Sequence, residues 1–594
     1  MKQLLIAAGL GCCAVSHSLT AGTIDAVYVD SPLKIHTEPA PAASRGIATR
    51  LQLDVADFAD VGRGQFLFME DFPLGESRRV TLQLEEASAL AHDAKLVVMQ
   101  HDNQGRLVEV ELPWPTSYIF RGTVVGDPTS TVFLAIGEKI ANGWISIDGT
   151  RFVIGTRYAD GMTLIYDEGN VPEGMINWAR YECGVSATKE DVARATGGGD
   201  RDPGDACPQV KIAIDTDYEF TSENFDGNAT AAADYVNALV SAVAGIYKAS
   251  VSDPTGKGIS LKLQYLRLWS IDDDPWTGTD TGSQLAEFSD YWQTYMGGVD
   301  RHLAHLLNAR ELGGGMAFLN GLCSDGTGYA VSGGMAGTFP MPLEGEQNGN
   351  WDPIVFAHET GHNFGMIHTH DSLWPFLPPT VDDANPDECG NDDCAGASGA
   401  PIMSYCHLCE GGIANIAMEF DEGNAERAEL FIATLSCSFY PDDPPILADD
   451  QAMTDMNTPV QIHVLDNDVA NDCNTLSILE FDSRAVRGGR IKLLQGSDDV
   501  LEYTPIGTIA GTDSFTYTAV DGSGNSDIAN VVIQINRPPT GGGGGGVDPN
   551  DVIFVITLWG SRTADCTGDG ITNVDDLLAV LEGKAKPNRR RNGK

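Results

Sequence analysis

The sequence has 594 residues, which is too long for one small domain and predicts several domains with at least one large core. Its 37 Lys and Arg stand against 84 Asp and Glu, and the formal net charge of −47 repels phosphate backbones and anionic lipid. The composition therefore argues against a nucleic-acid partner. The 67 glycines and 29 prolines predict many turns and flexible connections, as in an extracellular multidomain protein.

Residues 1–21 have the pattern of a secretory signal peptide. Met1 and Lys2 give a charged start, Leu4 to Val15 form an apolar run, and small residues follow up to Ala21. A buried helix and a lipidated Cys12 are the alternative explanations. Later stretches fall short of the roughly 18 apolar residues that a membrane span requires, so we expect a secreted or extracellular protein without a membrane span.

Linker-like stretches divide the rest of the chain at Ala195 to Asp200, Asp442 to Pro445 and Pro538 to Gly546. Before the first of these, residues 22–195 alternate apolar and polar side chains in short runs. Thr123 to Ile136 and Trp144 to Ile154 are examples, and such runs predict a β-rich region. The pattern therefore predicts a multidomain fold that begins with a β-rich unit.

Residues 207–440 mix two periodicities. Val210 to Ile214 and Leu261 to Leu268 have the pattern of buried strands, whereas Ala231 to Ala249 and Trp351 to Asn363 have the pattern of helices. This mixture predicts an α/β domain.

Three histidines and a glutamate in this α/β domain have the spacing of a catalytic metal site. His358 and His362 are four residues apart on the predicted helix, so both imidazoles reach one ion, and Glu359 lies beside them. Gly365 can leave the helix with positive φ and lead the chain back so that His368 becomes the third ligand. Three nitrogens leave one tetrahedral position open, which is typical of catalytic zinc. The pattern predicts amide hydrolysis in which zinc polarises the scissile carbonyl and Glu359 is the general base.

The string His358 to His368, HETGHNFGMIH, resembles the metzincin zinc peptidases. Within that clan it is most similar to the reprolysin or adamalysin type, whose sequence reads HNxGxxHD after the helix. Thr369 stands where the acid usually lies, and Asp371 follows two residues later. The resemblance implies a zinc endopeptidase with a metzincin fold that acts on protein or peptide substrates.

Pro401 to Tyr405, PIMSY, resembles the Met-turn of the same peptidases, which places Met403 beneath the metal. Tyr405 stands where astacin-like and serralysin-like members carry a tyrosine that approaches zinc or the oxyanion. Ordinary packing of Tyr405 is the alternative.

The resemblance extends upstream of the α/β domain. Tyr118 to Ile154 is similar to the reprolysin propeptide, and Glu182 to Val185 resembles that family's cysteine switch. This implies that the thiolate of Cys183 fills the fourth zinc position and keeps a zymogen latent until cleavage near Arg194 to Arg201. A disulfide between Cys183 and Cys207 is the alternative.

Cysteines cluster between Cys389 and Cys437, and in an exported chain they predict disulfides. A zinc site at Cys406 and Cys409 is the competing interpretation. The family resemblance implies a bridge between Cys323 and Cys437. Four cysteines would then brace the Met-turn, with three pairings open: Cys389, Cys394, Cys406 and Cys409.

Residues 445–537 return to short alternating runs and predict a β-sandwich. Three motifs resemble the bacterial cadherin-like immunoglobulin-type repeats: Val464 to Asp468, Tyr503 to Pro505 and Gly511 to Tyr517. The resemblance implies a spacer, or a role in carbohydrate or surface adhesion. Asp466 and Asp468 could hold calcium, with a solvated turn as the alternative.

The C-terminal residues comprise a Pro/Gly linker at 538–547, a small module at 548–583 and a basic tail at 584–594. The module resembles half of a dockerin, which implies a cell-surface or cohesin-like partner, although its first half lacks a ligand loop. Glycine stands at loop position 6 for the sharp turn. The predicted calcium ligands are Asp565, Thr567, Asp569, Ile571, Asn573 and Asp576, with a plain Asn/Asp turn as the alternative.

The sequence as a whole predicts a secreted zinc endopeptidase made as a latent zymogen. Its parts are a signal peptide, a β-rich propeptide, an α/β metzincin domain, a β-sandwich and a calcium-loop module. The competing hypothesis is a noncatalytic adhesion or scaffold protein with a vestigial metal site, and the intact Glu359 argues against it. A thermolysin-type site with a distant glutamate ligand is unnecessary because His368 is present.

Overall fold

A computed structural model of the chain describes residues 27–537 with short gaps, at 56–66, 173–175, 178–182, 192–207, 252–257, 342–346, 349–351, 371–388, 390–393, 395–396, 438, 440–443, 469, 471–475, 495–498, 508–509 and 523. The predicted signal peptide, glycine linker, dockerin-like module and basic tail lie outside the described residues.

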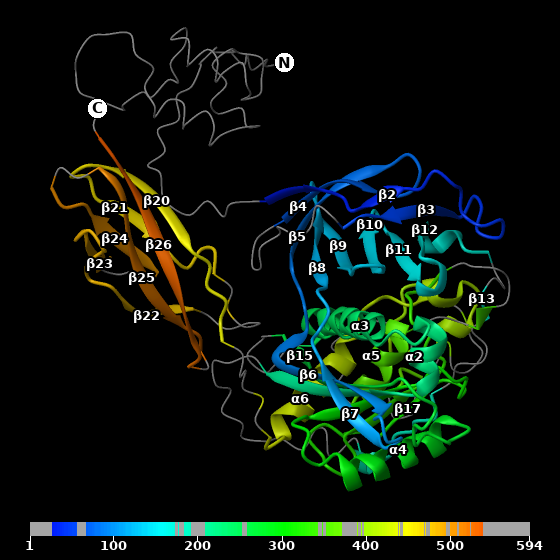
Figure 1. The fold of residues 1–594 in the computed structure, drawn as a ribbon. Helices are drawn as coiled ribbons and strands as arrows, with labels where there is room; N and C mark the ends of the chain where they lie inside the picture. Colours follow the sequence, from blue (N-terminus) through cyan, green and yellow to red (C-terminus); the bar gives the residue numbers. More distant parts are fainter. Residues whose placement is uncertain are drawn as a thin grey trace, which may run out of the picture.

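The N-terminal region forms a ten-stranded sheet in the order β1-β4-β5-β8-β9-β10-β11-β12-β3-β2 (Figure 1). Its strands are β1 (Val27–Asp30), β2 (Leu33–Ile35), β3 (Ala48–Leu53), β4 (Leu67–Pro73), β5 (Arg79–Glu86), β8 (Tyr118–Val124), β9 (Asp127–Ile136), β10 (Ala141–Ile147), β11 (Thr150–Arg157) and β12 (Met162–Asp167). Two short 3-10 helices follow β11 and β12: η2 (Tyr158–Asp160) and η3 (Glu168–Asn170). The prediction of a β-rich N-terminal region is confirmed.

Both faces of this sheet are buried at β9 and β10. Leu134 and Ile136 pack into the core of the N-terminal region, whereas Phe133 packs into a core shared with the α/β domain. Phe133 and Trp144 stack near Phe339 of the α/β domain, with ring centroids 6.1 and 6.0 Å from that of Phe339. Because successive side chains of a strand point to opposite faces, the continuous apolar run in β9 serves both cores.

The run from Trp144 to Ile154 is a hairpin rather than one strand. Asp148 and Gly149 have φ angles of 54° and 74°, and they connect β10 to β11. An Asp-Gly pair with positive φ at both positions is the turn that fits the twist of a two-residue hairpin.

The α/β domain is built on a seven-stranded sheet in the order β17-β18-β16-β14-β15-β6-β7. Its strands are β6 (Leu90–His101), β7 (Leu107–Leu112), β14 (Gln209–Thr216), β15 (Ser260–Trp269), β16 (Leu303–Leu307), β17 (Gly315–Ala317) and β18 (Tyr329–Ser332). The helices are α2 (Tyr218–Phe225), α3 (Ala229–Ser250), α4 (Thr281–Tyr295), α5 (Asp352–Asn363) and α6 (Glu422–Thr434), with η4 (Cys406–Leu408) and η5 (Gly412–Asn415) before α6. A separate two-stranded pair joins β13 (Ile176–Asn177) to β19 (Gln347–Asn348).

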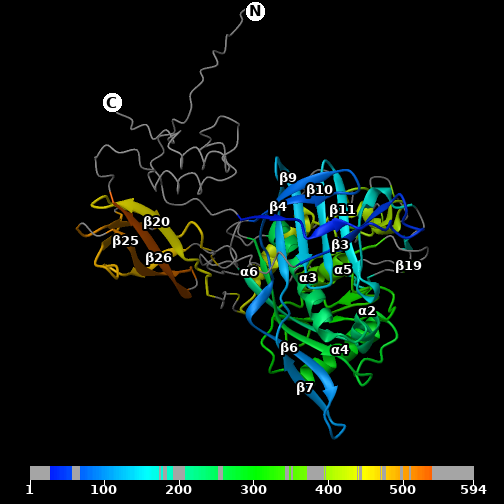
Figure 2. The ribbon, with the colours of Figure 1, turned by 45° about the horizontal axis from the view of Figure 1, so that its top comes forward.

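Helices cover both faces of this sheet. Ile212 of β14 packs with α3 and α5 on one face, and Phe288 and Trp292 of α4 cover the other face (Figures 1 and 2). The predicted elements at Val210 to Ile214, Leu261 to Leu268, Ala231 to Ala249 and Trp351 to Asn363 are confirmed as β14, β15, α3 and α5.

Two strands of this sheet come from the N-terminal region, which the sequence did not predict. β6 pairs in parallel with β15, and β7 pairs antiparallel with β6 at the edge of the sheet. Residues Leu96 to Met99 of β6 are buried on both faces. A parallel strand covered on both faces is expected to be continuously apolar, and this run has that composition.

Helix α3 is the central helix of the protein. Asn228 caps its start by accepting a hydrogen bond from the backbone nitrogen of Ala231 at 3.1 Å. Among the described residues it is the one helix long and apolar enough to cross a membrane, and 72% of its apolar window is buried inside the protein. The expectation that no stretch has this length and composition was therefore wrong for α3, whose apolar side chains serve the core.

A buried ion pair joins β14 to β15. The carboxylate of Asp215 accepts hydrogen bonds from the guanidinium of Arg267, and both side chains are at most 1% exposed. The indole nitrogens of Trp269 and Trp292 also donate to Asp215, at 3.2 and 2.9 Å. Each carboxylate oxygen therefore has a donor.

Asp215→Ala is expected to destabilise the α/β domain by about 3–5 kcal/mol, because Arg267 would remain buried without its counter-ion. For a domain of this size the thermal midpoint should fall by roughly 10 °C, measured by calorimetry. Arg78→Ala, which removes an exposed partner of Asp148, is the control and should change little. Equal midpoints for the two variants would show that the buried pair is dispensable.

Disulfides brace the α/β domain near α6. The bridge between Cys323 and Cys437, expected from the family resemblance, is confirmed. The four remaining cysteines pair as Cys389–Cys406 and Cys394–Cys409. A cysteine zinc site at Cys406 and Cys409 is thereby excluded. Such bridges persist in oxidising compartments, which agrees with an extracellular location.

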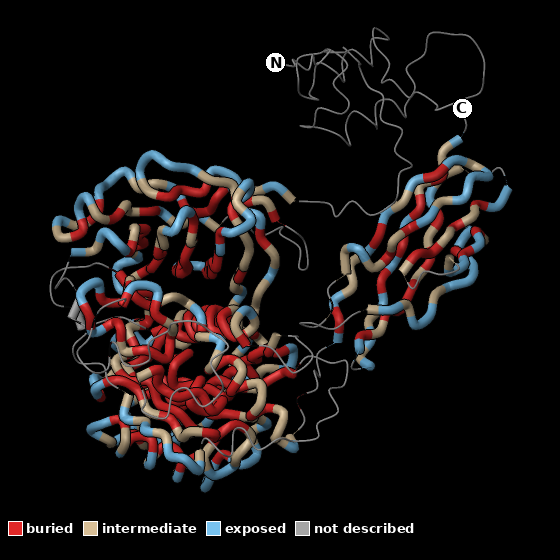
Figure 3. The backbone as a smooth tube through the Cα atoms, turned by 180° about the vertical axis from the view of Figure 1, so that it is seen from behind, coloured by how far each residue is buried: buried red, intermediate tan, exposed pale blue. Residues whose placement is uncertain are grey.

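The predicted β-sandwich is confirmed as two sheets, β20-β26-β25-β22 and β21-β24-β23, around a core of its own (Figure 3). Its strands are β20 (Asp450–Asp455), β21 (Val460–His463), β22 (Ser477–Phe481), β23 (Arg490–Leu493), β24 (Val500–Thr504), β25 (Gly511–Val520) and β26 (Ser526–Asn536).

Candidate metal centre

Helix α5 places His358 and His362 on one face, as their spacing predicts. Every residue of this helix is buried. At its start, Asp352 accepts hydrogen bonds from the hydroxyl of Tyr235 and from the backbone nitrogens of Ala336 and Gly337. The helix is therefore fixed at the end that precedes the histidines.

Gly365 ends the turn after α5 with a φ of 87°, as predicted, and the chain then returns toward the helix. This return brings the Nε2 atom of His368 to 3.1 Å from Nε2 of His358 and to 3.2 Å from Nε2 of His362. The three predicted ligands are therefore brought together by one reversal of the chain.

Backbone carbonyls fix the orientation of the first two imidazoles. The Nδ1 atoms of His358 and His362 lie 2.9 Å from the carbonyl oxygens of Ile402 and Met366, and the tautomer that donates there leaves Nε2 free as a ligand atom. Burial lowers the pKa of all three histidines, that of His362 to about 4. They are therefore neutral at physiological pH, which is the form that binds a metal.

Cys183 lies at the same point, although it is 179 residues away from His362 along the chain. Its Sγ is 3.3 Å from Nε2 of His362, and the thiol and the three imidazoles form a cluster whose ligand atoms lie within 4.8 Å of one another. Cys183 is a free cysteine, so it forms no bridge to Cys207, which itself lies outside the described residues.

Burial raises the pKa of the Cys183 thiol, and the neighbouring Glu359 carboxylate raises it further. The protein groups around the thiol therefore disfavour its anion. A cation held by the histidines is what would favour the thiolate at this position.

Tyr405 holds the backbone of Cys183 from both sides. Its hydroxyl accepts a hydrogen bond from the Cys183 nitrogen at 2.8 Å and donates one to the Cys183 carbonyl at 2.6 Å. The predicted alternatives for Tyr405 were a contact with zinc or ordinary packing. In the structure the Tyr405 hydroxyl has a specific partner in the N-terminal region, and contact with zinc stays a prediction.

Glu359 lies beside the cluster and is fully buried. Its Oε2 is 3.5 Å from Sγ of Cys183, and its Oε1 has no hydrogen-bond partner within the described residues. Burial raises the pKa of Glu359 to about 8. Gly315 of β17 abuts this carboxylate, because a Cβ atom there would lie 2.3 Å from Oε1. Glu359 is therefore confined between β17 and Cys183.

Met403, predicted to lie in a Met-turn, is fully buried below the helix. A Cβ atom on Gly361, between the two histidines, would be 3.0 Å from its sulfur. Glycine at this position lets the Met403 sulfur approach α5 closely.

Sequence reasoning missed the contribution of helix α6. Asn424 donates to the carbonyl of Ile367 and accepts from its nitrogen, both at 2.9 Å, and Arg427 donates to the carbonyl of Gly365. The ring of His370 stacks on His368, with centroids 5.0 Å apart. No spacing rule links α6 to a loop some 60 residues earlier, so these contacts could not be predicted from the sequence.

Asn424→Ala is expected to weaken zinc binding by about 10–100-fold, because the loop that carries His368 would lose both of its hydrogen bonds to Asn424. Competition with a chromophoric chelator measures this affinity. Glu426→Gln changes an α6 residue for which no bond to this loop is seen and is the control. An unchanged affinity in Asn424→Ala would exclude a positioning role for Asn424.

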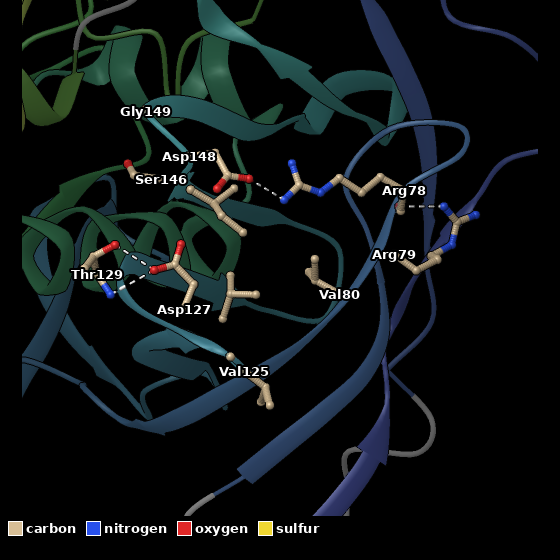
Figure 4. Close-up of a pocket in the computed structure, with 12 residues that line it drawn as sticks. Arg78, Arg79, Val80, Val125, Asp127, Thr129, Ser146, Asp148 and Gly149 are labelled. Atoms are coloured by element: carbon tan, nitrogen blue, oxygen red, sulfur yellow. Dashed lines mark hydrogen bonds and ion pairs between the residues drawn. The ribbon is translucent and has the colours of Figure 1, made fainter. Parts of the chain in front are cut away.

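A surface hollow of about 760 Å³ lies elsewhere, between β5 and the turns that follow β8 and β10 (Figure 4). Two interactions cross its lining: Arg78 donates to Asp148 at 2.9 Å, and the Thr129 hydroxyl donates to Asp127. The hollow contains no histidine or cysteine.

The donor set around His362 suits zinc. Three neutral imidazole nitrogens and one thiol are ligands that zinc accepts in tetrahedral sites, and the unpartnered Oε1 of Glu359 lies next to them. The six predicted calcium ligands, from Asp565 to Asp576, lie outside the described residues.

Comparison with protein families gives two matches. Residues 208–413 match the reprolysin model of metallo-peptidase family M12, and residues 442–534 match the bacterial Ig domain. Comparison with curated proteins gives no match.

Among solved structures, metalloproteinase-II from Bacteroides fragilis is 12% identical, with a TM-score of 0.29, over 51% of this chain and 81% of that chain. A nucleoside hydrolase-related hypothetical protein from Saccharophagus degradans is 13% identical, with a TM-score of 0.14, over 19% of this chain and 30% of that chain. Similarities this low carry no inference about the fold. The two family matches show that the chain contains a family M12 metallopeptidase domain followed by a bacterial Ig domain.

Proposed function

We propose that this chain is the latent precursor of a secreted zinc endopeptidase. The observation that carries the proposal is the cluster of His358, His362, His368 and Cys183 beside the buried Glu359. In this proposal the three histidines hold the metal, Glu359 is the general base, and Cys183 keeps the enzyme silent. The substrate is a peptide or protein, as the metallopeptidase domain implies.

A zinc ion held by the three histidines would polarise the scissile carbonyl and lower the pKa of a water molecule. Glu359 would take the proton from that water and then pass it to the departing amine nitrogen. Its confinement against Gly315 holds the carboxylate near the histidines without immobilising it through a hydrogen bond on Oε1.

An extended substrate would bind along β17. This strand is at the edge of the sheet, and its first residue, Gly315, contacts Glu359. An edge strand offers free backbone donors and acceptors to an extended peptide, which would bring a scissile bond past the base.

Latency in this proposal rests on the segment from Cys183 to Asp191. Tyr405 holds the backbone of Cys183, and Asn320 donates to the carbonyl of Asp191 at 2.9 Å. Gly184 packs on Met316 of β17, because a Cβ atom there would lie 2.1 Å from its terminal methyl. The segment thus covers the strand along which a substrate would bind. Cleavage within residues 192–207 would release it.

The remaining modules are proposed to position the enzyme at a surface or partner and to take no part in catalysis. The bacterial Ig domain would be a spacer or an adhesion module. Residues 548–583 would bind calcium and a cohesin-like or cell-surface partner. A noncatalytic adhesion protein is the competing function, and the retained Glu359 beside three convergent histidines favours the enzyme.

Cleavage of casein tests the proposed function. The full chain is cut within residues 192–207 by a second protease, freed of that protease, and assayed as prepared, after chelation and after zinc is restored. Activity that disappears on chelation and returns with zinc supports a zinc peptidase. Bound zinc without any cleavage of casein or of a peptide library would favour the adhesion protein.

After such a cut the N-terminal region is expected to dissociate more readily at neutral pH than at low pH. Asp234 of α3 lies in the interface, where it accepts a hydrogen bond from Ser117 and abuts Gly137. Burial raises the pKa of Asp234 from 3.8 to about 6. The negative charge of Glu138 also raises this pKa, whereas the hydrogen bond from Ser117 lowers it. Release of the region would expose Asp234 and return its pKa toward 3.8.

Between pH 3.8 and about 6, Asp234 is protonated when the N-terminal region is bound and ionised when it is released. This proton uptake strengthens binding at low pH, and the gain in affinity is lost as the pH rises through about 6. We expect the affinity of the cleaved N-terminal region to be about tenfold higher at pH 5 than at pH 7.5, measured by fluorescence anisotropy. Asp234→Asn should remove most of this difference, and Glu223→Gln, an exposed change on α2, should keep it. A pH profile unaltered by Asp234→Asn would contradict the assignment.

A further inference from the structure

A second cluster of oxygen atoms lies in the β-sandwich, at the start of β20. Asp450 is the first residue of this strand and is only 8% exposed. Its Oδ2 is buried and has no hydrogen-bond partner among the described residues. A carboxylate oxygen buried without a donor is costly, so the protein needs something else to satisfy it.

Asp468, in the loop after β21, approaches from the other side. Its two oxygens accept hydrogen bonds from the backbone nitrogen of Ala448 at 2.9 Å and from the hydroxyl of Tyr517 at 2.7 Å. The same hydroxyl lies 2.6 Å from the carbonyl oxygen of Val464 and also interacts with Asp450. A hydroxyl has one proton, so Tyr517 cannot satisfy three acceptors together.

Asn467 adds another unpaired oxygen. Its amide nitrogen donates to the carbonyls of Ala448 and Asp449, both at 3.3 Å, which places this side chain against the backbone just before Asp450. Its Oδ1 is buried and has no hydrogen-bond partner in the described part of the chain. The start of β20 and the loop after β21 meet here, and each contributes one buried oxygen without a hydrogen-bond donor among the described residues: Oδ2 of Asp450 and Oδ1 of Asn467.

The charges around Asp450 have the same sign. Burial raises the pKa of Asp450 to about 8, and Asp468, Asp449 and Asp466 raise it as well, opposed by Tyr517. Burial also raises the pKa of Asp468, to about 6. Two carboxyl groups that repel each other in a buried position are stabilised either by a proton or by a cation.

We propose that Asp450, Asn467 and Asp468 form a calcium site in the Ig domain. The candidate ligand atoms are all oxygens. Calcium is a hard divalent cation that takes carboxylate and amide oxygens as ligands. Calcium would satisfy the unpartnered oxygens of Asp450 and Asn467 and remove the repulsion between Asp450 and Asp468. It would also fasten the first strand of the domain, next to the junction with the metallopeptidase domain, to the loop after β21.

Counting bound calcium tests the site. The full chain, carrying Glu359→Gln to prevent self-cleavage, is dialysed against roughly 5 mM calcium, a concentration above the usual range for extracellular modules. Bound calcium per chain is compared with that of the same protein carrying Asp450→Asn. Asp482→Asn is the matched control, because Asp482 is an exposed carboxylate of the same domain that accepts from Thr516.

We expect Asp450→Asn to bind one calcium fewer than the parent and the Asp482 control to bind the same number as the parent. In excess chelator, Asp450→Asn should unfold at the same temperature as the parent or higher, because it removes a buried repulsion. If Asp450→Asn does not fold, Asp468→Asn is the second variant. Equal calcium counts in the parent and in the folded variant would overturn the proposal and leave a proton shared between Asp450 and Asp468 as the explanation.

Discussion

Glu359→Gln should lower kcat/KM for a peptide substrate by about 10²–10⁴-fold while zinc remains bound, because the amide cannot accept a proton from water. Glutamine has nearly the same shape as glutamate, so it fits the space between Gly315 and Cys183. His358 and His362 keep their carbonyl partners, and all three imidazoles keep their convergent nitrogens. The change therefore removes the base and leaves the proposed metal ligands in place.

Zinc content by atomic absorption and initial rates on a fluorogenic peptide should be measured on the same samples. His362→Ala is the informative contrast, because it should lose both zinc and activity. Glu359→Gln with near-normal kcat/KM would remove Glu359 from the mechanism. A variant that loses zinc as well would show that Glu359 supports metal binding rather than proton transfer.

A second large effect is expected from Cys183→Ala, which should make the uncleaved precursor active on short peptides. The thiol lies 3.3 Å from Nε2 of His362, and its removal would free the position that a water molecule needs. Tyr405 would still hold the backbone at residue 183, and Gly184 would still pack on Met316. We therefore expect activity on short peptides to rise by at least about tenfold, with a smaller gain on casein.

The precursor must be shown to be uncut by electrophoresis before and after the assay. Lys189→Ala, an exposed change in the same segment, should leave the precursor silent. An uncut Cys183→Ala precursor that is equally silent would mean that the segment from Cys183 to Asp191 blocks the site by its bulk alone. Latency would then depend on Tyr405 and Asn320 rather than on the thiol.

The sequence predicted the local elements of the site well. The spacing of His358 and His362 requires only the period of one helix, and Gly365 is the residue between His358 and His368 at which the chain reverses with positive φ. Likewise, strands and helices of the α/β domain follow from the period of their apolar residues. These features depend on interactions between residues a few positions apart, which a sequence displays directly.

The tertiary structure alone decided the contacts between distant segments. Tyr405 bonds to the backbone of Cys183, Asn424 holds the loop before His368, and β6 pairs with β15 although the two strands belong to regions that the sequence separates. The same holds for the unpartnered oxygens of Asp450 and Asn467. The family resemblance, rather than any periodicity, predicted that Cys183 lies at the metal site, and the structure brings its thiol to His362. A periodic pattern records which side of an element is buried, but not which surface covers it. Side-chain periodicity therefore determined the elements and the metal-binding motif. Packing between elements decided how the segment from Cys183 to Asp191 covers the site, how β6 and β7 join the sheet of the α/β domain, and where the proposed calcium ligands meet.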